Sequence, residues 1–156
     1  MSGDDDHQLR VSKIHNGTVI DHVPGGQALN VLAILGIDGS RGETVSVAMN
    51  VPSGHLGRKD IVKVEGRELT PDEVDVLSLI APHATINIVR EYDVVDKHRV
   101  EPTDVVVDVL ACPNPGCITN ASEPITTRFD VLEDGVRCGY CETIVREDIA
   151  THIRAV

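Results

Sequence analysis

The chain has 156 residues, a length that allows one ordinary domain or two small ones. Its formal net charge is −11, from 25 acidic and 14 basic residues, and aromatic residues make up only 2% of it. This composition excludes a general binder of nucleic acid or of anionic membranes, because such proteins need a basic face and single-strand binders also need aromatic rings for stacking.

Residues 1–102 show the alternation of apolar and polar positions that is typical of strands, interrupted by Gly, Pro and Asn turns. The clearest case is the segment 44–51, where valine or methionine occupies every second position. Patterns of this kind predict strands at residues 9–14, 18–23, 44–51, 61–64, 84–89 and 90–95.

Two further segments in this part predict helices. Residues 27–35 carry Ala and Leu close to helical spacing, and Gly36 is well placed to end that helix. The second helix begins with Thr70 and Glu73, which form the pattern of a capping box around a proline at the first helical position. It continues until Pro82, because the residue before a proline disfavours helical dihedrals.

The order of these elements is strand, helix, strand, strand, helix and strand, with an extra terminal strand. It predicts a ferredoxin-like α+β sandwich, in which two helices cover an antiparallel sheet. Residues 101–104 have the composition of a boundary, so we expect a first domain at residues 1–102 and a second at 103–156. The second is expected to be a small all-β domain, with strands at residues 105–110, 125–132 and 141–145.

All four cysteines of the chain lie in the second part as two pairs, Cys112 with Cys117 and Cys138 with Cys141. Pro and Gly beside them are the residues that tight turns need. The spacing predicts a closed tetrahedral Zn²⁺ site, one ion per chain, to which each turn contributes two thiolates. Two disulfides or four unrelated thiols are the alternatives. Disulfides need an oxidising compartment, and no apolar leader is recognised, so we expect a cytoplasmic protein.

This zinc site is expected to be structural. Four thiolates saturate the ion and leave no position for water or substrate. The segment 103–156 is close to the size at which a small domain needs a metal to fold, and zinc binding worth about 10–16 kcal/mol is enough to decide the matter. Because no P-loop and no nucleophile with its base can be recognised, and no run of 18 apolar residues occurs, we expect neither an enzyme nor a membrane protein.

Five stretches of the sequence together carry a family signature: residues 18–22, 52–60, 81–87, 112–124 and 138–141. A Cys-x-x-Cys pair alone is common, but these stretches in this order over nearly the whole chain are specific. In them the chain resembles the regulatory chains of aspartate carbamoyltransferase. The resemblance implies an allosteric, non-catalytic subunit of pyrimidine biosynthesis, in which a nucleotide-binding domain precedes a zinc domain.

The resemblance also implies partners. The zinc domain would dock on the catalytic chain of aspartate carbamoyltransferase, and homodimers of this chain would bridge catalytic trimers. CTP and ATP would compete for one site as effectors. The side chains implied for that pocket are Val11, Ile14, Asp21, His22, Ile61, Lys63, Asn87, Val89, Tyr92, Val94 and Lys97. In this assignment Lys63 and Lys97 meet phosphates, and Asp21 lies by the ribose.

The residues themselves support this pocket in part, because all four lysines precede residue 102. From the residues alone, however, each lysine is better explained as a solvated surface residue that a neighbouring acid neutralises. Two positions depart from the family pattern. Gln8 stands where a lysine is common, and Ser12 stands where a glutamate is common.

Two other functions compete with the regulatory chain. One is a zinc-ribbon adaptor in transcription or RNA processing, which the acidic charge and the scarcity of aromatic residues disfavour. The other is a small zinc enzyme, which the saturated cysteine site disfavours. The acid-rich, lysine-poor composition suits a high-salt cytoplasm, where screening weakens self-repulsion.

Overall fold

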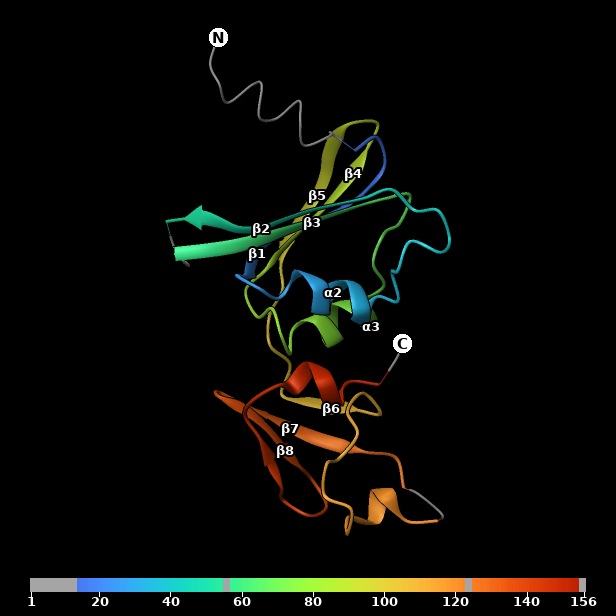
Figure 1. Cartoon of the computed structure of the whole chain (residues 1–156), viewed down its shortest axis with the longest axis vertical. Coiled ribbons are helices and arrows are strands. Elements are labelled where there is room, and N and C mark those ends of the chain that lie inside the picture. Colours follow the sequence, from blue (N-terminus) through green and yellow to red (C-terminus); the bar gives the residue numbers. More distant parts are fainter. Residues whose placement is uncertain (1–13, 55–56, 123–124, 155–156) are drawn as a thin grey trace.

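The computed structural model describes residues 14–54, 57–122 and 125–154 of the chain. These residues form two sheets, one in each half of an elongated molecule whose two parts lie end to end (Figure 1). The strand predicted at residues 9–14 falls almost wholly outside the described residues.

The first sheet has five strands in the order β2-β3-β1-β4-β5, and every neighbouring pair is antiparallel. Without β5 this is the strand order of a ferredoxin-like sandwich, so the predicted α+β class is confirmed. The strands are β1 (Gly17–Pro24), β2 (Val45–Ser53), β3 (Gly57–Glu65), β4 (Thr85–Arg90) and β5 (Asp93–Arg99).

Two short helices, α2 (Ala28–Ile34) and α3 (Pro71–Leu77), cover one face of this sheet. The central strands alternate, so that every second side chain packs against the helices and its neighbours point to the opposite face. The side chains that are buried between sheet and helices include Ile20, Val31, Val62, Val64, Val76, Leu77 and Ile86. The core therefore lies on the helix side, and no helix of the described residues covers the outer face of the sheet.

The predicted capping box at the start of α3 is present. Thr70 Oγ1 accepts the backbone N–H of Glu73, and a Glu73 carboxylate oxygen accepts the N–H of Thr70. The helix is shorter than expected, because the turn after Leu77 tightens. The N–H groups of Leu79 and Ile80 donate to carbonyls three residues back instead of four.

A buried carboxylate joins three segments of this first domain. Asp60 in β3 is fully buried and accepts backbone N–H groups from Gly26, Ala28 and Asn50 at 2.8–2.9 Å. Gly26 and Ala28 lie at the start of α2, and Asn50 lies at the irregularity of β2. Asp60 thereby holds the helix start and the bulged edge strand against β3.

The second sheet contains β6 (Val105–Val107), β7 (Arg128–Leu132), β8 (Gly135–Cys138) and β9 (Ile144–Val145), in that order and antiparallel. Two 3-10 turns accompany it, η1 (Ile118–Asn120) and η2 (Ile149–His152). Its core is small and consists of Val106, Leu110, Phe129, Val136 and Val145 together with three of the cysteines. The expected all-β character of this domain is confirmed.

Several elements differ from the sequence prediction: β3 begins at Gly57 instead of residue 61, and β7 and β9 begin at Arg128 and Ile144 instead of residues 125 and 141. The segment 90–95 is not one strand, because Glu91 and Tyr92 have positive φ values of 51° and 70° and turn the chain between β4 and β5. Residues 97–99, which gave no strand signal, belong to β5. Strand β6 ends at Val107 because Asp108 adopts a φ of 59°. Strand β8 was missed, although its two-residue hairpin loop ends just before Gly135.

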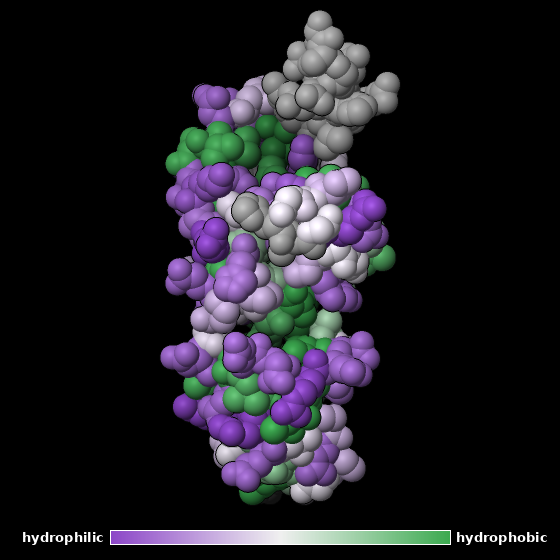
Figure 2. Space-filling model, turned by 90° about the vertical axis from the view of Figure 1, so that its left-hand side faces the viewer, coloured by the Kyte–Doolittle hydropathy of each residue, from purple (hydrophilic) through white to green (hydrophobic). Residues whose placement is uncertain are grey.

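The two domains touch through apolar side chains. Val109 and Ile153 of the second domain pack against both cores, and Leu79 after α3 packs against the second core. Hydrophobic surface is visible in the hollow between the upper and lower parts of the molecule (Figure 2). In the part of the chain that the structure describes, no helix has the length and apolar character needed to cross a membrane.

Candidate functional site

The two cysteine pairs lie on facing turns of the second domain. Cys112 and Cys117 flank a turn in which the Asn114 side-chain oxygen accepts the N–H of Gly116, and the Asn114 carbonyl accepts the N–H of Cys117. Cys138 ends β8, and its carbonyl accepts the N–H of Glu142 in the turn that carries Cys141. Asn120 Nδ2 donates to the carbonyl of Cys112 and so fastens the first turn.

The four sulfur atoms all lie within 4.8 Å of one another. Cys112 Sγ and Cys141 Sγ are 3.6 Å apart, and Cys117 Sγ and Cys138 Sγ are 3.8 Å apart. A tetrahedral ion with metal–sulfur bonds of about 2.3 Å requires sulfur–sulfur separations of about 3.8 Å. The donor set and its spacing therefore fit one tetrahedral metal ion.

The same distances exclude the disulfide alternative. A disulfide requires sulfur atoms about 2.05 Å apart, whereas all four cysteines are free thiols here. Three of the four are buried and belong to the core of the second domain. A cation bound by them would join turns that are distant in sequence and would hold the small core together.

A threonine follows the second cysteine of each pair at the same spacing. Thr119 Oγ1 donates to Cys117 Sγ at 3.1 Å, and Thr143 Oγ1 lies 3.1 Å from Cys141 Sγ. Hydrogen bonding to Thr143 lowers the pKa of the Cys141 thiol to about 6. Burial raises the pKa of the Cys112 thiol to about 12. The repeated Cys-x-Thr pattern is visible in the sequence, but its spacing alone gave no reason to single it out.

The second candidate site is the outer face of the first sheet. The registers pair Lys63 with Val19, Val19 with Asn87, and Asn87 with Lys97. These four residues form one row across β3, β1, β4 and β5. The two lysines lie three strand spacings apart, which is about 14 Å, and their side chains are long enough to converge. Burial lowers the pKa of Lys63, and the nearby charge of Asp21 partly opposes this shift.

A second group of polar side chains lies along the same face at the β1 irregularity. His22 has a φ of 57°, and its Nδ1 atom lies 3.1 Å from Thr85 Oγ1. The Asp21 carboxylate forms an ion pair with Lys59, in which Oδ1 lies 3.0 Å from Nζ. The bulge thus turns two of the residues expected in the pocket toward polar partners on β3 and β4.

The remaining expected pocket residues lie on both sides of this row, with Ile61 on the side of Asp21 and the others toward the β4–β5 turn. Val89 and Val94 are register partners, and Tyr92 lies in the turn between their strands. The N–H of Tyr92 donates to the carbonyl of His15, and the two rings lie 4.7 Å apart. Ile14 and Val89 are buried without belonging to the helix-side core, while Ile61 is half-buried in β3. Val11 lies outside the described residues.

Three residues of this face were missed from the sequence. Lys59 pairs with Asp21, Val19 stands between Lys63 and Asn87, and Arg99 lies two positions beyond Lys97, opposite Thr85. Strand alternation would have found Val19 and Arg99, because residues two positions apart share a face. The ion pair of Lys59 depends on the bulge, for which the sequence gave no signal.

Two family models match this chain in succession. The allosteric domain of the aspartate carbamoyltransferase regulatory chain matches residues 9–101, and the metal-binding domain of the same protein matches residues 104–151. The metal-binding description agrees with the cysteine cluster, which lies within the second match.

Curated relatives carry the name of the same regulatory chain and match this chain over nearly their whole length. The aspartate carbamoyltransferase regulatory chain of Haloarcula marismortui is 68% identical over 97% of this chain and 98% of its own. That of Natronomonas pharaonis is 68% identical over 95% of this chain and 97% of its own, and that of Methanoculleus marisnigri is 56% identical over 93% and 94%. Because these relatives are regulatory chains, this chain is a non-catalytic subunit. It belongs to the family of aspartate carbamoyltransferase regulatory chains.

Proposed function

We propose that this chain is the nucleotide-sensing subunit of an aspartate carbamoyltransferase of pyrimidine biosynthesis. Its first domain, residues 1–102, binds CTP and ATP in competition on the outer face of the sheet. Its second domain, residues 103–156, is held by one zinc ion and docks on the catalytic chain. The observation that carries the nucleotide site is the row from Lys63 through Val19 and Asn87 to Lys97.

Charge explains why this row suits a nucleoside triphosphate. The ligand brings three to four negative charges to a chain whose net charge is −11, so it needs local cations. Lys63 is half-buried, where an ammonium group has lost part of its hydration and gains more from a phosphate. Asn87 supplies an amide between the two lysines, and Asp21, paired with Lys59, and His22, beside Thr85, lie on the same face for contacts with the sugar or the base.

Calorimetric titration of CTP and of ATP into the Lys63→Ala chain tests this site. A hydrogen bond to a charged group contributes about 1.5–3 kcal/mol, so each affinity should fall by roughly tenfold or more. Arg146→Ala is the matched control, since it removes one cation from an ion pair in the second domain. Affinities that are equal in wild type, Lys63→Ala and a Lys63→Ala/Lys97→Ala double variant would refute the pocket.

The metal is proposed to be zinc, bound by Cys112, Cys117, Cys138 and Cys141. Four thiolates in a tetrahedral arrangement favour Zn²⁺ or iron among common metals, and zinc suits a site with no redox role. Elemental analysis of the purified chain should find one zinc ion per chain. A stoichiometric amount of iron, or no metal in a folded second domain, would contradict the assignment.

The edge strand β2 supports a homodimer. Its nine residues carry no charge, and Val47 and Met49 are each 40% exposed, whereas the opposite edge strand β5 contains four charged residues besides a histidine. Exposed uncharged edges invite pairing with another strand. The N–H of Glu65 donates to the carbonyl of Thr44, so Thr44 and Glu65 form a hydrogen-bonded pair at the end of the β2–β3 ladder. Hydrogen-bonded and non-hydrogen-bonded pairs alternate along an antiparallel ladder. Val45 and Val47 therefore direct their N–H and C=O groups away from β3. A two-fold axis at Val47 would pair these groups with a second copy.

Sedimentation equilibrium tests this dimer. The Val47→Lys chain should be monomeric at concentrations where wild type is dimeric, because the substitution places a charge on the axis. Ile118→Lys is the control, since Ile118 is 50% exposed and lies in η1 of the second domain. A dimer that persists in Val47→Lys would exclude β2 as the contact.

Reconstitution with the catalytic chain tests the regulatory role as a whole. A nucleotide can alter activity only if it binds two states of the assembly unequally, and such couplings are about 1–3 kcal/mol. The dependence of activity on aspartate should therefore shift by roughly fivefold or more when CTP or ATP is added. Lys63→Ala should move this response to higher nucleotide concentration without changing assembly. A complex whose activity ignores both nucleotides would refute the proposal.

A further inference from the structure

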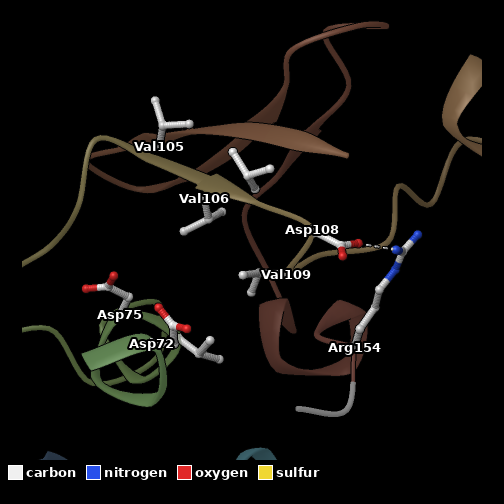
Figure 3. A pocket seen from close by; sticks show the side chains of 9 residues that line it. Asp72, Asp75, Val105, Val106, Asp108, Val109 and Arg154 are labelled. Carbon is white, nitrogen blue, oxygen red and sulfur yellow. Dashed lines mark hydrogen bonds and ion pairs between the residues drawn. The ribbon is translucent and has the colours of Figure 1, made fainter. Parts of the chain in front are cut away.

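A hollow lies between the two domains. It has a volume of about 340 Å³ and separates helix α3 from strand β6. Figure 3 shows Asp72 and Asp75 projecting from the helix toward the strand, with Val105 and Val106 opposite them and Arg154 at the far end. Neither candidate site above uses this cleft.

Strand β6 presents an open edge at this cleft. It is the first strand in the order β6-β7-β8-β9, so among the described residues only its edge toward β7 is paired. The backbone carbonyl of Asp104 accepts the N–H of Val131, and the backbone N–H of Asp108 donates to the carbonyl of Thr127. In the β6–β7 ladder these two hydrogen-bonded pairs are the neighbours of Val105 and Val107. Because antiparallel pairs alternate, Val105 and Val107 direct their N–H and C=O groups away from β7. Val107 is also 54% exposed.

The charges of the cleft favour a cationic occupant. Its lining contains three carboxylates, on Asp72, Asp75 and Asp108, and one guanidinium, on Arg154. Arg154 Nη1 lies 2.7 Å from Asp108 Oδ1, so this pair neutralises itself. Asp72 and Asp75 are exposed and have no ion-pair partner among the described residues, which leaves two negative charges beside an apolar strand.

We propose that an extended segment of the catalytic chain, carrying Lys or Arg, adds to the edge of β6 in this cleft. Its backbone would pair with Val105 and Val107, and its cations would face Asp72 and Asp75 on α3. Strand addition of this kind takes affinity from main-chain hydrogen bonds and specificity from the flanking side chains. The segment would touch both domains at once. This inference rests on the proposed association with a catalytic chain.

Two other occupants fit less well. The segment of this chain before the described residues contains Asp4, Asp5 and Asp6, whose charge matches that of the cleft instead of complementing it. Direct closure of α3 onto β6 would bring the carboxylates of Asp72 and Asp75 toward that of Asp108. It would also leave the outward N–H groups of β6 without acceptors, because the carbonyls of a regular helix are already used within the helix.

Photo-crosslinking in the reconstituted complex tests the location. Val107 is replaced by p-benzoylphenylalanine, and Leu29, which is 63% exposed on α2, receives the same group as a control. We expect the group at position 107 to form an adduct with a segment of the catalytic chain and the group at position 29 to form none there. Adducts confined to this chain, to a second regulatory chain, or absent from an assembled complex would overturn the proposal.

Charge variants test the chemistry. Asp72→Asn/Asp75→Asn should weaken binding of the catalytic chain by about tenfold and reduce its sensitivity to salt. The control Asp93→Asn/Glu101→Gln makes the same change of net charge at exposed positions outside the cleft. Equal affinity of both variants would refute the docking site while leaving the regulatory role intact. Failure of the wild-type chain to bind any catalytic chain would instead refute the proposed function, and the docking site with it.

Discussion

Replacing Asp60 by Asn changes one atom of a buried group and should destabilise the first domain strongly. The Asp60 carboxylate is fully buried, and its Oδ2 atom accepts the N–H groups of Gly26 and Ala28 at 2.9 and 2.8 Å. Its Oδ1 atom accepts the N–H of Asn50 at 2.8 Å. An amide keeps only one oxygen, so its NH₂ group must face at least one of these donors.

The magnitude follows from these three bonds. One hydrogen bond to a charged acceptor is lost, at about 1.5–3 kcal/mol, and one buried donor is left unsatisfied, at a further ~1–3 kcal/mol. Their sum, about 2.5–6 kcal/mol, corresponds to a fall of at least about 10 °C in the unfolding midpoint of a domain of this size. The cost is large because the same group fastens α2 and the β2 bulge to β3.

Thermal unfolding of the metal-loaded chain, followed by circular dichroism, measures the midpoint. Hydrogen exchange supplies a local readout, since the amides of Gly26, Ala28 and Asn50 should lose protection together. Asp93→Asn is the control, because Asp93 is exposed on β5. The reasoning fails if Asp60→Asn and Asp93→Asn unfold at the same midpoint, or if the three amides remain protected.

Three further predictions concern the two candidate sites and the subunit itself. Cys138→Ala should abolish metal binding and the hydrogen-exchange protection of β7 and β8 while leaving nucleotide affinity unchanged. Normal assembly of a metal-free Cys138→Ala chain with the catalytic chain would contradict this. Burial lowers the pKa of Lys63, so this lysine loses its charge at a lower pH than an ordinary lysine does. As the pH is raised, nucleotide affinity should therefore begin to fall at a lower pH in wild type than in Lys63→Arg. Calorimetry across pH compares the two chains, and parallel profiles would exclude Lys63 as the titrating group. The purified chain alone should show no carbamoyltransferase activity, and turnover that follows this chain through purification would overturn its non-catalytic assignment.

Local patterns predicted most of the elements. The capping box of Thr70 and Glu73 marked the start of α3, because its hydrogen bonds join residues only three positions apart. The alternation of segment 44–51 marked β2, and the spacing of the cysteines marked two turns that each offer two thiols. Where local signals were weak or misleading, as at the positive φ values of Tyr92 and Asp108, the predicted strands were misplaced.

The sequence by itself therefore determined the local elements and the four thiols, since both depend on residues that are near one another in the chain. Only the tertiary structure decided which distant residues meet. Lys63, Asn87 and Lys97 share one row because β1 lies between β3 and β4, and that strand order comes from burying one face of the whole sheet under two helices. Asp60 gives no sign of burial in sequence, because its three donors lie 10 to 34 residues away. The cleft between α3 and β6 exists only because two separate cores pack end to end, with Val109 and Ile153 between them.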